Sequence, residues 1–297
     1  MALINHKYKL LDKIGEGCFG SIFKGKNIRT NEEVAIKIEP IATQSKLLKN
    51  ESTIYQYLLN TNGIPSVKWY GKDEHNYYMV LNLLGDSLQT VKDNVGVFSL
   101  KATLQIGIQV ISLLQTIHDK GLIHRDIKPD NFLFGLNDTK NQLYIIDFGF
   151  CRTFINNDTK VHIPMSKLNN LIGSQTYASI NAHNYTELSR RDDLESLFYM
   201  LIYFVRNQNL EWQNIDIDCN NREKNIIIKE KKLNMIENPN INIPPVLIKC
   251  LRMIREIEFE DSPKYFDIIN LMNNNTLTKK QIFAIQRHQK ELMKKKC

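Results

Sequence analysis

Two short polar segments in the middle of the chain constrain it most: His124-Arg-Asp-Ile-Lys-Pro-Asp-Asn131 and, further on, Asp147-Phe-Gly149. They bring two carboxylates, one ammonium group and one carboxamide onto short loops, at Asp126, Lys128, Asn131 and Asp147. One carboxylate can accept the proton of an attacking hydroxyl, and the lysine can bind a transferred phosphoryl group. The amide and the second carboxylate can hold Mg²⁺. The segments therefore predict a site for a metal-bound polyphosphate.

The spacing of these groups is specific. Asp126 and Asn131 are five positions apart (131 − 126), as in the pattern H-R-D-x-x-x-x-N, and the triplet D-F-G follows. The two segments resemble the catalytic loop and the metal-binding triplet of protein kinases. Chance is a poor explanation for both motifs in this order.

The length and composition allow one or two globular domains with a sizeable core. The chain has 297 residues, of which 42% are hydrophobic and 24% are charged. Its net charge of +7 favours acidic or phosphorylated partners, nucleic acid or an anionic membrane. A solvated basic surface with a basic tail would give the same excess, and we prefer this simpler interpretation.

The cysteines and apolar runs indicate an intracellular protein. Five scattered cysteines form neither a C-x-x-C pair nor a zinc spacing, which predicts reduced thiols. The N-terminus lacks the apolar stretch of a signal peptide. The longest apolar run, 197–205, has nine residues, whereas a bilayer span needs about 20. We expect that run to be a buried helix, and the location to be cytoplasmic, with the nucleus as the alternative.

The N-terminal part is expected to be rich in strands, within 8–39 and 64–84. The sequence Gly15-Glu-Gly-Cys-Phe-Gly20 is by itself a weak motif, and in a dinucleotide-binding fold a helix would follow it. Here Ser21–Gly25 alternates like a strand, so the glycine segment is expected to join two strands. Its glycines would let the backbone approach phosphates closely.

Lys37 lies in the apolar run Val34-Ala-Ile-Lys-Ile38. It either faces outward as an ordinary strand lysine or binds ATP phosphates and pairs with a glutamate on a helix. The stretch 44–59 has helical periodicity, and Glu51 near its middle is the candidate partner. A solvated helix face would look the same in isolation.

Gly85 breaks the strand pattern, and we place a boundary there. The predicted fold is α+β and bilobal: a small β-rich lobe over 1–84 and a larger helical lobe over 85–275, together one domain. A basic helix-forming tail, 276–297, follows. The segment Leu81–Leu84 would be the hinge that offers backbone groups to adenine.

The second lobe is expected to contain short strands at 132–134 and 143–146. Helices are expected over 100–120, 190–205, 244–253 and 264–272. The stretch 219–242 is polar and is expected to form loop and helix on the surface. Asp193, at the start of one helix, is expected to tether the backbone of the catalytic loop. The segment 150–178 corresponds to the activation segment of a kinase and shapes the peptide groove.

Further motifs narrow the resemblance to the casein kinase 1 family. They are Leu83-Leu-Gly-Asp-Ser-Leu88, Asp126-Ile-Lys-Pro-Asp-Asn-Phe-Leu133, Tyr177-Ala-Ser-Ile-Asn181 and Ser189-Arg-Arg-Asp-Asp-Leu-Glu-Ser196. Most kinases carry A-P-E after the activation segment, whereas this family carries Ser-Ile-Asn, as this chain does. The likeness covers residues 8–272. It implies a serine/threonine kinase that uses ATP and Mg²⁺ and is usually active without activation-loop phosphorylation.

The resemblance also assigns roles residue by residue. The implied catalytic set is Asp126 as base and positioning carboxylate, Lys128 as transition-state cation, Lys37 as phosphate lysine and Glu51 as its ion-pair partner. The implied Mg²⁺ ligands are Asn131 and Asp147. The implied nucleotide-binding set is Ile14, Gly15, Glu16, Gly17, Cys18, Phe19, Gly20, Ile22, Ala35, Lys37, Leu81, Leu84, Leu133 and Ile146, with Ile22 and Ala35 above the adenine and Leu133 below it.

Departures from the family concern Cys18, where serine is common, and the anchor for a primed phosphate. The family's G-T-A-R-Y reads Gly173-Ser-Gln-Thr-Tyr177, so Thr176 replaces an arginine. Asn169 stands where a lysine is usual, and Lys224 is the third member that remains. A site with fewer cations binds a phosphate group less well, because bidentate anion recognition is weakened. We therefore expect acidic protein substrates, and a kinase that depends less on their prior phosphorylation than its relatives do.

The remaining expectations concern partners and rival functions. The end, Lys294-Lys-Lys-Cys297, either is a solvated tail or holds a membrane through an acylated cysteine, and we favour the tail. A pseudokinase scaffold that binds nucleotide or partners is the alternative function, which the intact motifs oppose. Specific nucleic-acid binding lacks a motif. We expect a monomer.

Overall fold

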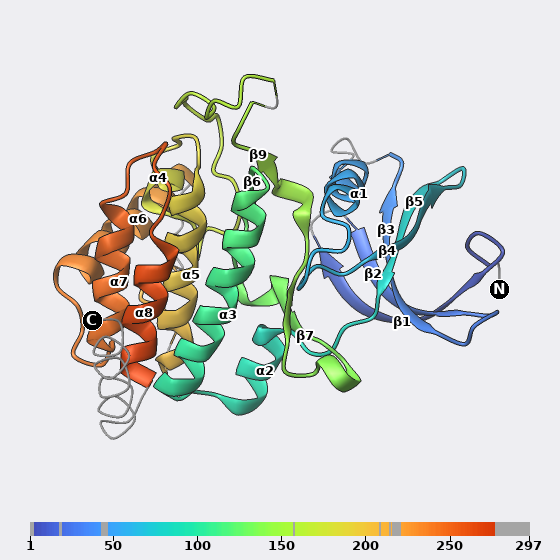
Figure 1. The fold of residues 1–297 in the computed structure, drawn as a ribbon, viewed down its shortest axis with the longest axis horizontal. Helices are drawn as coiled ribbons and strands as arrows, with labels where there is room; N and C mark the ends of the chain where they lie inside the picture. The colour runs from blue at the N-terminus through green and yellow to red at the C-terminus, as the bar shows by residue number, and fades with distance from the viewer. Residues whose placement is uncertain are drawn as a thin grey trace, which may run out of the picture.

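A computed structural model of the chain describes residues 3–17, 20–42, 47–156, 158–207, 209–213, 215 and 221–276. Figure 1 shows two lobes, one built around an antiparallel sheet with a single helix and the other mostly helical. This is the α+β, bilobal architecture predicted from the sequence. The predicted tail beyond Thr276, including Cys297, lies outside the described residues.

The N-terminal lobe is a five-stranded sheet in the order β1-β2-β3-β5-β4. Its strands are β1 (Tyr8–Gly17), β2 (Gly20–Asn27), β3 (Glu33–Pro40), β4 (Val67–Lys72) and β5 (Asn76–Asn82). In β3 the side chains alternate, as the pleat requires. Val34 and Ile36 are fully buried against Tyr8 and Val80, whereas Ala35 and Lys37 are partly exposed on the opposite face. The strand pattern therefore determines which face Lys37 presents.

The glycine segment joins β1 to β2, as predicted, with Gly17 opposite Gly20. A side chain at Gly20 is impossible without a shift, because a Cβ there would lie 2.0 Å from the carbonyl oxygen of Ile38 on β3. Gly20 therefore allows the close pairing of β2 and β3 beside this turn.

Helix α1 (Leu47–Tyr57) is the helix of the N-terminal lobe. It buries Leu48, Glu51 and Tyr55. Its first turn is fixed to β3, because Oε2 of Glu39 accepts a hydrogen bond of 2.7 Å from the backbone N–H of Leu48. A carboxylate at this end also complements the helix dipole. The contact sets the position of α1 against the sheet.

The C-terminal lobe is built around α5, which is buried along most of its length. Its helices are α2 (Leu88–Val95), α3 (Leu100–Asp119), α4 (Ile180–His183), α5 (Arg190–Val205), α6 (Asn221–Glu237), α7 (Pro245–Arg255) and α8 (Tyr265–Thr276). In Figure 1, α3 lies beside α5 and α8, and α5 also packs against α7. The nine-residue apolar run 197–205 is thus a buried helix, as predicted.

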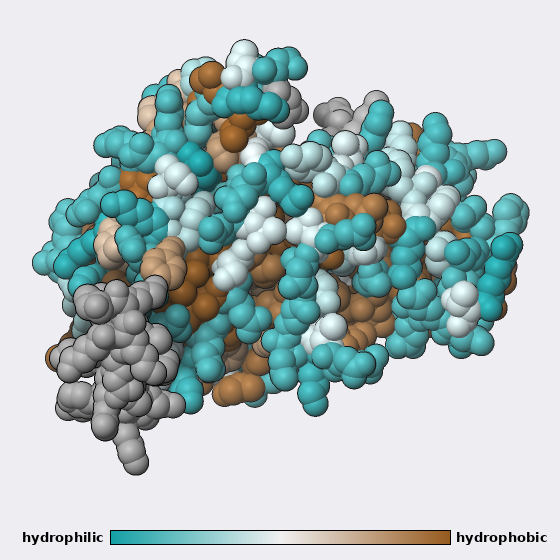
Figure 2. All heavy atoms as spheres, in the orientation of Figure 1, coloured by the Kyte–Doolittle hydropathy of each residue, from teal (hydrophilic) through white to brown (hydrophobic). Residues whose placement is uncertain are grey.

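Helix α3 is long and apolar enough to cross a bilayer by length and composition alone. Its apolar stripe, which includes Leu104, Ile111 and Leu114, is buried in the core of the C-terminal lobe. An apolar helix is expected there, and hydrophilic side chains cover most of the face of the molecule shown in Figure 2.

Short strand pairs bring the polar loops together. β6 (Leu122–Ile123) pairs with β9 (Arg152–Thr153), and β7 (Phe132–Phe134) pairs with β8 (Leu143–Ile145). Beside the second pair, the N–H of Ile146 donates to the carbonyl of Asn131 over 2.9 Å. The ladder therefore places the segment after Asp126 next to the segment that begins at Asp147.

The prediction of a surface element over 219–242 is wrong in one respect. Helix α6 has a polar outer face, but Asn225, Ile228, Lys232 and Met235 are buried. The apolar stripe of α6 recurs with helical spacing, and a lysine occupies one of its positions. The high overall polarity of the stretch hid this stripe.

Candidate active site

Lys37 and Asp147 meet at the junction of the two lobes. Nζ of Lys37 lies 2.7 Å from Oε2 of Glu51 on α1 and 3.0 Å from Oδ1 of Asp147. The two partners are 14 and 110 positions away in the chain. Of the two interpretations of Lys37, the structure supports the paired lysine, because its side chain is only 16% exposed.

Mutual attraction keeps Lys37 and Asp147 ionised, whereas burial, only partly offset by Lys37, raises the pKa of Glu51 to about 7. Burial alone would lower the pKa of Lys37, but the Glu51 and Asp147 carboxylates outweigh burial and raise the pKa above its ordinary value. Burial tends to raise the pKa of Asp147, and Lys37 overcomes this so that the net shift is downward. Lys37 is therefore a fixed cation, and Asp147 is a carboxylate at neutral pH.

Asp126 is the centre of the catalytic loop and is 3% exposed. Its Oδ2 lies 2.8 Å from Nζ of Lys128 and accepts a hydrogen bond of 3.2 Å from Nδ2 of Asn131. Its Oδ1 accepts a hydrogen bond of 2.9 Å from the backbone N–H of Ser174 in the activation segment. The structure thus brings together the carboxylate, the cation and the amide predicted from the sequence, and it ties them to the activation segment.

Asp193 tethers the catalytic loop, as predicted. Its two carboxylate oxygens accept hydrogen bonds from the backbone N–H groups of His124, at 2.7 Å, and Arg125, at 2.8 Å. Nε2 of His118 lies 3.0 Å from the same carboxylate. Arg125 has a φ of 69°, in the left-handed region that costs free energy for a non-glycine residue. The tether holds this conformation immediately before Asp126.

Phe148 positions Asp147 beside Lys37. Its ring is fully buried between Tyr55 of α1, with ring centroids 5.0 Å apart, and His124 of the catalytic loop, at 5.2 Å. Asp147 has a φ of 64°, and its N–H donates to the Tyr55 hydroxyl over 3.3 Å. The packing of this phenylalanine determines whether such a site is assembled, and here it is.

The predicted adenine-contacting residues surround the same junction. Ile22 is opposite Lys37 in the β2–β3 ladder, and Ala35 is opposite Leu81 in the β3–β5 ladder. Leu133 on β7 forms a bridge with Ser87 just after the hinge. The sequence predicted Ile22, Ala35, Leu81 and Leu133 as contacts of the nucleotide. Each of these four side chains is partly exposed, which leaves surface for a ligand.

The hinge and glycine segment complete the predicted nucleotide set. The N–H of Gly85 donates to the carbonyl of Phe134 over 2.8 Å, so the segment that follows Leu84 is fixed to β7. Ile14 is half exposed, and Glu16 makes a surface ion pair with Lys13. Predicted members at Cys18 and Phe19 lie outside the described residues.

The side chains of Asn131 and Asp147 fit a divalent cation. Nδ2 of Asn131 is used in hydrogen bonds to Asp126, which leaves Oδ1 as the donor atom for a metal. Lys37 binds Oδ1 of Asp147, and Oδ2 is its second oxygen. Carboxylate and amide oxygens together with substrate phosphates are the usual ligands of Mg²⁺. Lys37 would lie beside the same phosphates.

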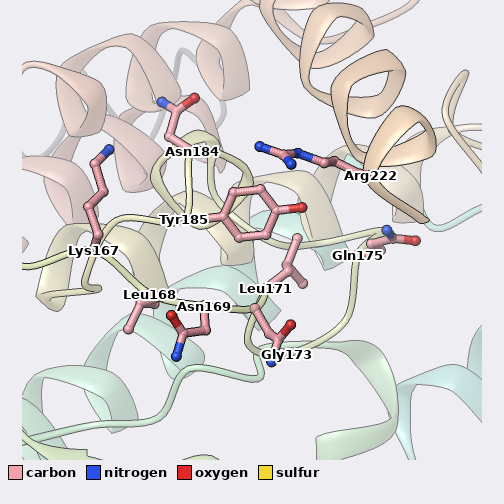
Figure 3. A pocket seen from close by; sticks show the side chains of 10 residues that line it. Lys167, Leu168, Asn169, Leu171, Gly173, Gln175, Asn184, Tyr185 and Arg222 are labelled. Carbon is pink, nitrogen blue, oxygen red and sulfur yellow. The ribbon is translucent and has the colours of Figure 1, made fainter. Parts of the chain in front are cut away.

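A polar pocket lies next to the catalytic loop (Figure 3). Its lining is Lys167, Leu168, Asn169, Asn170, Leu171, Gly173, Gln175, Asn184, Tyr185 and Arg222. Among the described lining residues, carboxamides form the largest group, two side chains are cationic, and none is acidic. Gly173 has a φ of 83°, and a Cβ there would lie 2.3 Å from the carbonyl oxygen of Arg125. This glycine therefore lets the pocket wall pack against the catalytic loop.

Asn169 lines the pocket, and the cation that α6 contributes to the described lining is Arg222 and not Lys224. The role of Lys224 in a phosphate anchor stays a prediction. The helix repeat explains the difference, because positions 222 and 224 point in directions roughly 200° apart. The lining cations in the described part of the chain are thus Lys167 and Arg222.

Sequence reasoning missed Lys232, which holds the wall behind this pocket. The side chain is fully buried, and Nζ lies 3.1 Å from the carbonyl of Gln175, 2.6 Å from that of Ala178 and 3.0 Å from Nε2 of His183. Burial lowers the pKa of Lys232 well below its ordinary value. In its charged form the group has three N–H donors, and each has an acceptor here. The rings of Tyr199 and Trp212 lie within cation–π distance, at 4.6 and 5.5 Å. The apolar spacing of Ile228, Lys232 and Met235 was the available signal.

His183 is neutral in this network. Its Nδ1 lies beside Oδ1 of Asn225, which can only accept, so Nδ1 carries the proton and Nε2 accepts from Lys232. Burial first, and then the charge of Lys232, lower the pKa of His183 to about 3. The unfolded chain has a histidine of ordinary pKa, near 6.5.

This difference predicts acid sensitivity. Between about pH 6.5 and about pH 3 the unfolded chain binds a proton at His183 that the folded chain does not, so stability falls as the pH falls. The slope from this residue is up to about 1.4 kcal/mol per pH unit. Urea unfolding of wild type and His183→Gln at neutral and acidic pH should show a flatter dependence for the variant. Equal slopes would contradict the neutral histidine.

The geometry is that of a phosphotransferase site, and the comparison with known families agrees. A family model described as protein kinase domain matches residues 8–291. The chain therefore belongs to the protein kinase family. Members of this family transfer phosphate to proteins, which defines the class of reaction and of substrate for this fold.

Proposed function

We propose that this protein is a serine/threonine kinase of the casein kinase 1 type that transfers the γ-phosphoryl group of ATP, with Mg²⁺, to hydroxyl groups of protein substrates. The observation that carries the proposal is the position of Lys37, which contacts Glu51 and Asp147 at once while Asp126, Lys128 and Asn131 converge beside them. The sequence motifs around residues 83–88, 126–133, 177–181 and 189–196 support the narrower family.

Each side chain would contribute by position and charge. MgATP, when bound, supplies the phosphoryl group and the bridging metal charge. Asp126 accepts the proton of the substrate hydroxyl and orients it. Lys128, whose pKa is raised mainly by Asp126 against the effect of burial, remains charged and stabilises the charge that develops on the transferred group. Lys37 holds the remaining phosphates.

The direct test is transfer of labelled phosphate from ATP to casein, followed by phosphoamino acid analysis. We expect label on serine and threonine, loss of transfer on chelation of Mg²⁺, and none on tyrosine. Label confined to tyrosine would contradict the serine/threonine proposal. Absence of transfer by folded protein that binds ATP would favour the pseudokinase scaffold.

The pocket of Figure 3 supports acidic substrates. Lys167 and Arg222 place two cationic side chains in its wall, and the lining residues within the described part of the chain include no carboxylate. Asn169 and Gln175 offer amide donors that suit a single carboxylate, and Arg222 is the one guanidinium among the described lining residues, whereas a phosphate dianion is best held by several guanidinium groups. We therefore propose that an acidic residue near the acceptor hydroxyl suffices for recognition.

A peptide series tests this specificity. Wild type should phosphorylate peptides with aspartate or with phosphoserine three residues before the acceptor with kcat/KM values within about fivefold of each other. Thr176→Arg should raise the preference for the phosphorylated peptide by about tenfold, because a bidentate charged contact is added. Thr176→Gln is the matched control without the charge. A strong preference of wild type for the phosphorylated peptide would refute the proposal.

A further inference from the structure

Glu187 is a buried carboxylate that joins two arginines from distant parts of the chain. Its side chain is 2% exposed. Oε2 lies 2.5 Å from a terminal guanidinium nitrogen of Arg152 on β9, and Oε1 lies 3.6 Å from one of Arg125 in the catalytic loop. Arg125 immediately precedes Asp126, and Arg152 follows the Asp147 triplet closely. The mechanism proposed above uses neither arginine.

Arg125 requires an anion beside it, because its charge is largely buried, whereas Arg152 is 43% exposed. The side chain of Arg125 is 12% exposed, and burial together with the nearby charge of Arg152 disfavours its cationic form, while Glu187 opposes both effects. Asp193 is the other carboxylate close to Arg125, but its oxygens accept from the backbone N–H groups of His124 and Arg125. Removing the anion from such a cluster leaves a buried charge uncompensated.

Glu187 is also connected to the activation segment. Its N–H donates to the carbonyl of Ser166 over 2.9 Å, and the Ser166 hydroxyl lies 3.5 Å from its carboxylate. Next to this contact, Lys167 pairs with Thr186 in a β-bridge, and the N–H of Leu168 donates to the carbonyl of Tyr185 over 2.7 Å.

These two backbone segments form part of the wall of the pocket in Figure 3, which Lys167, Leu168 and Tyr185 line. The carboxylate therefore links three parts: the catalytic loop through Arg125, the start of the activation segment through Arg152, and the substrate pocket through Ser166. In many kinases a phosphate added to the activation segment makes such links by pairing with arginines.

We propose that Glu187 is a positioning residue that replaces an activation-segment phosphate: its carboxylate pairs with Arg125 and Arg152 and thereby assembles the substrate pocket without a modification. The inference rests on the proposed kinase activity. It extends that function, because it identifies the group that makes activity independent of phosphorylation.

The kinetic test uses Glu187→Ala and Glu187→Gln, with the exposed Glu258→Gln as matched control. Both Glu187 variants should lose about tenfold or more in kcat/KM for an acidic peptide, and the control should stay within about twofold of wild type. Sulfate, compared with chloride at equal ionic strength, should restore part of the activity of Glu187→Ala relative to wild type, because the anion can bind between the two arginines. A structural defect alone would give no specific rescue.

Thermal unfolding provides a readout that does not depend on phosphate transfer. Sulfate should raise the Tm of Glu187→Ala more than that of wild type or Glu258→Gln. This result separates the two proposals: an inactive wild type would refute the kinase function, while the sulfate effect would still report on the arginine pair. If neither Glu187 variant folds, Arg152→Gln tests the same site, since its side chain is 43% exposed, and a several-fold loss of kcat/KM is expected.

Phosphatase treatment completes the experiment. Wild type from which all phosphate has been removed, as verified by mass spectrometry, should retain its full initial rate. The proposal is overturned if the dephosphorylated enzyme loses activity, or if the Glu187 variants match wild type in kcat/KM and in their response to sulfate.

Discussion

Asp126→Asn is expected to lower kcat for phosphate transfer by about 10²- to 10⁴-fold, which is the usual contribution of a positioned general base. The substitution keeps the size of the side chain, and an amide oxygen can still accept the hydrogen bond from Ser174. It removes the charge that pairs with Lys128 and the ability to take a proton. The variant should therefore still bind ATP, with some loss of stability because the new amide N–H faces the donors of Lys128 and Asn131.

Lys37→Met should abolish transfer by a second route. It removes the cation between Glu51 and Asp147, so two carboxylates face each other and the phosphates lose their partner. Transfer of labelled phosphate to casein measures both variants. Asp138→Asn and Lys49→Met, at exposed positions, are the matched controls and should retain activity. Substantial transfer by either Asp126→Asn or Lys37→Met would contradict the assigned site.

Asp193→Asn should have the largest effect on stability. The carboxylate accepts hydrogen bonds from two backbone N–H groups and contacts His118, all in a buried site. An asparagine has one acceptor oxygen, and its NH₂ group would face another donor. Leaving a buried charged interaction broken in this way costs about 3–5 kcal/mol.

Urea unfolding should show this loss of free energy for Asp193→Asn, and kcat should fall because the catalytic loop before Asp126 loses its tether. Asp138→Asn is again the control, since it makes the same chemical change on the surface. An unfolding free energy within about 1 kcal/mol of wild type would show that Asp193 does not contribute this stabilisation.

Lys232 and Glu187 illustrate what could not be predicted. Both are charged residues in polar stretches of sequence, and such residues are usually solvated. Their burial depends on partners far along the chain: the carbonyls of Gln175 and Ala178 for Lys232, and the guanidinium group of Arg152 for Glu187. The helical spacing of the buried face of α6 indicates that Lys232 faces the core, but no periodicity in the sequence specifies these partners. The presence of Arg222 rather than Lys224 in the pocket wall was unpredictable for the same reason, because it depends on how α6 is rotated against the activation segment.

The sequence by itself determined the elements whose signals are local. The apolar run Val34–Ile38 predicted the strand that holds Lys37, and the apolar run 197–205 predicted the buried part of α5. The fixed spacing within His124–Asn131 predicted which groups share one loop. Only the tertiary structure decided that Lys37 meets both Glu51 and Asp147, and that Glu187 joins two arginines. Local signals act over a few residues through backbone geometry. These contacts join residues that are 14 to 110 positions apart in the chain, and they arise only when the whole core has packed.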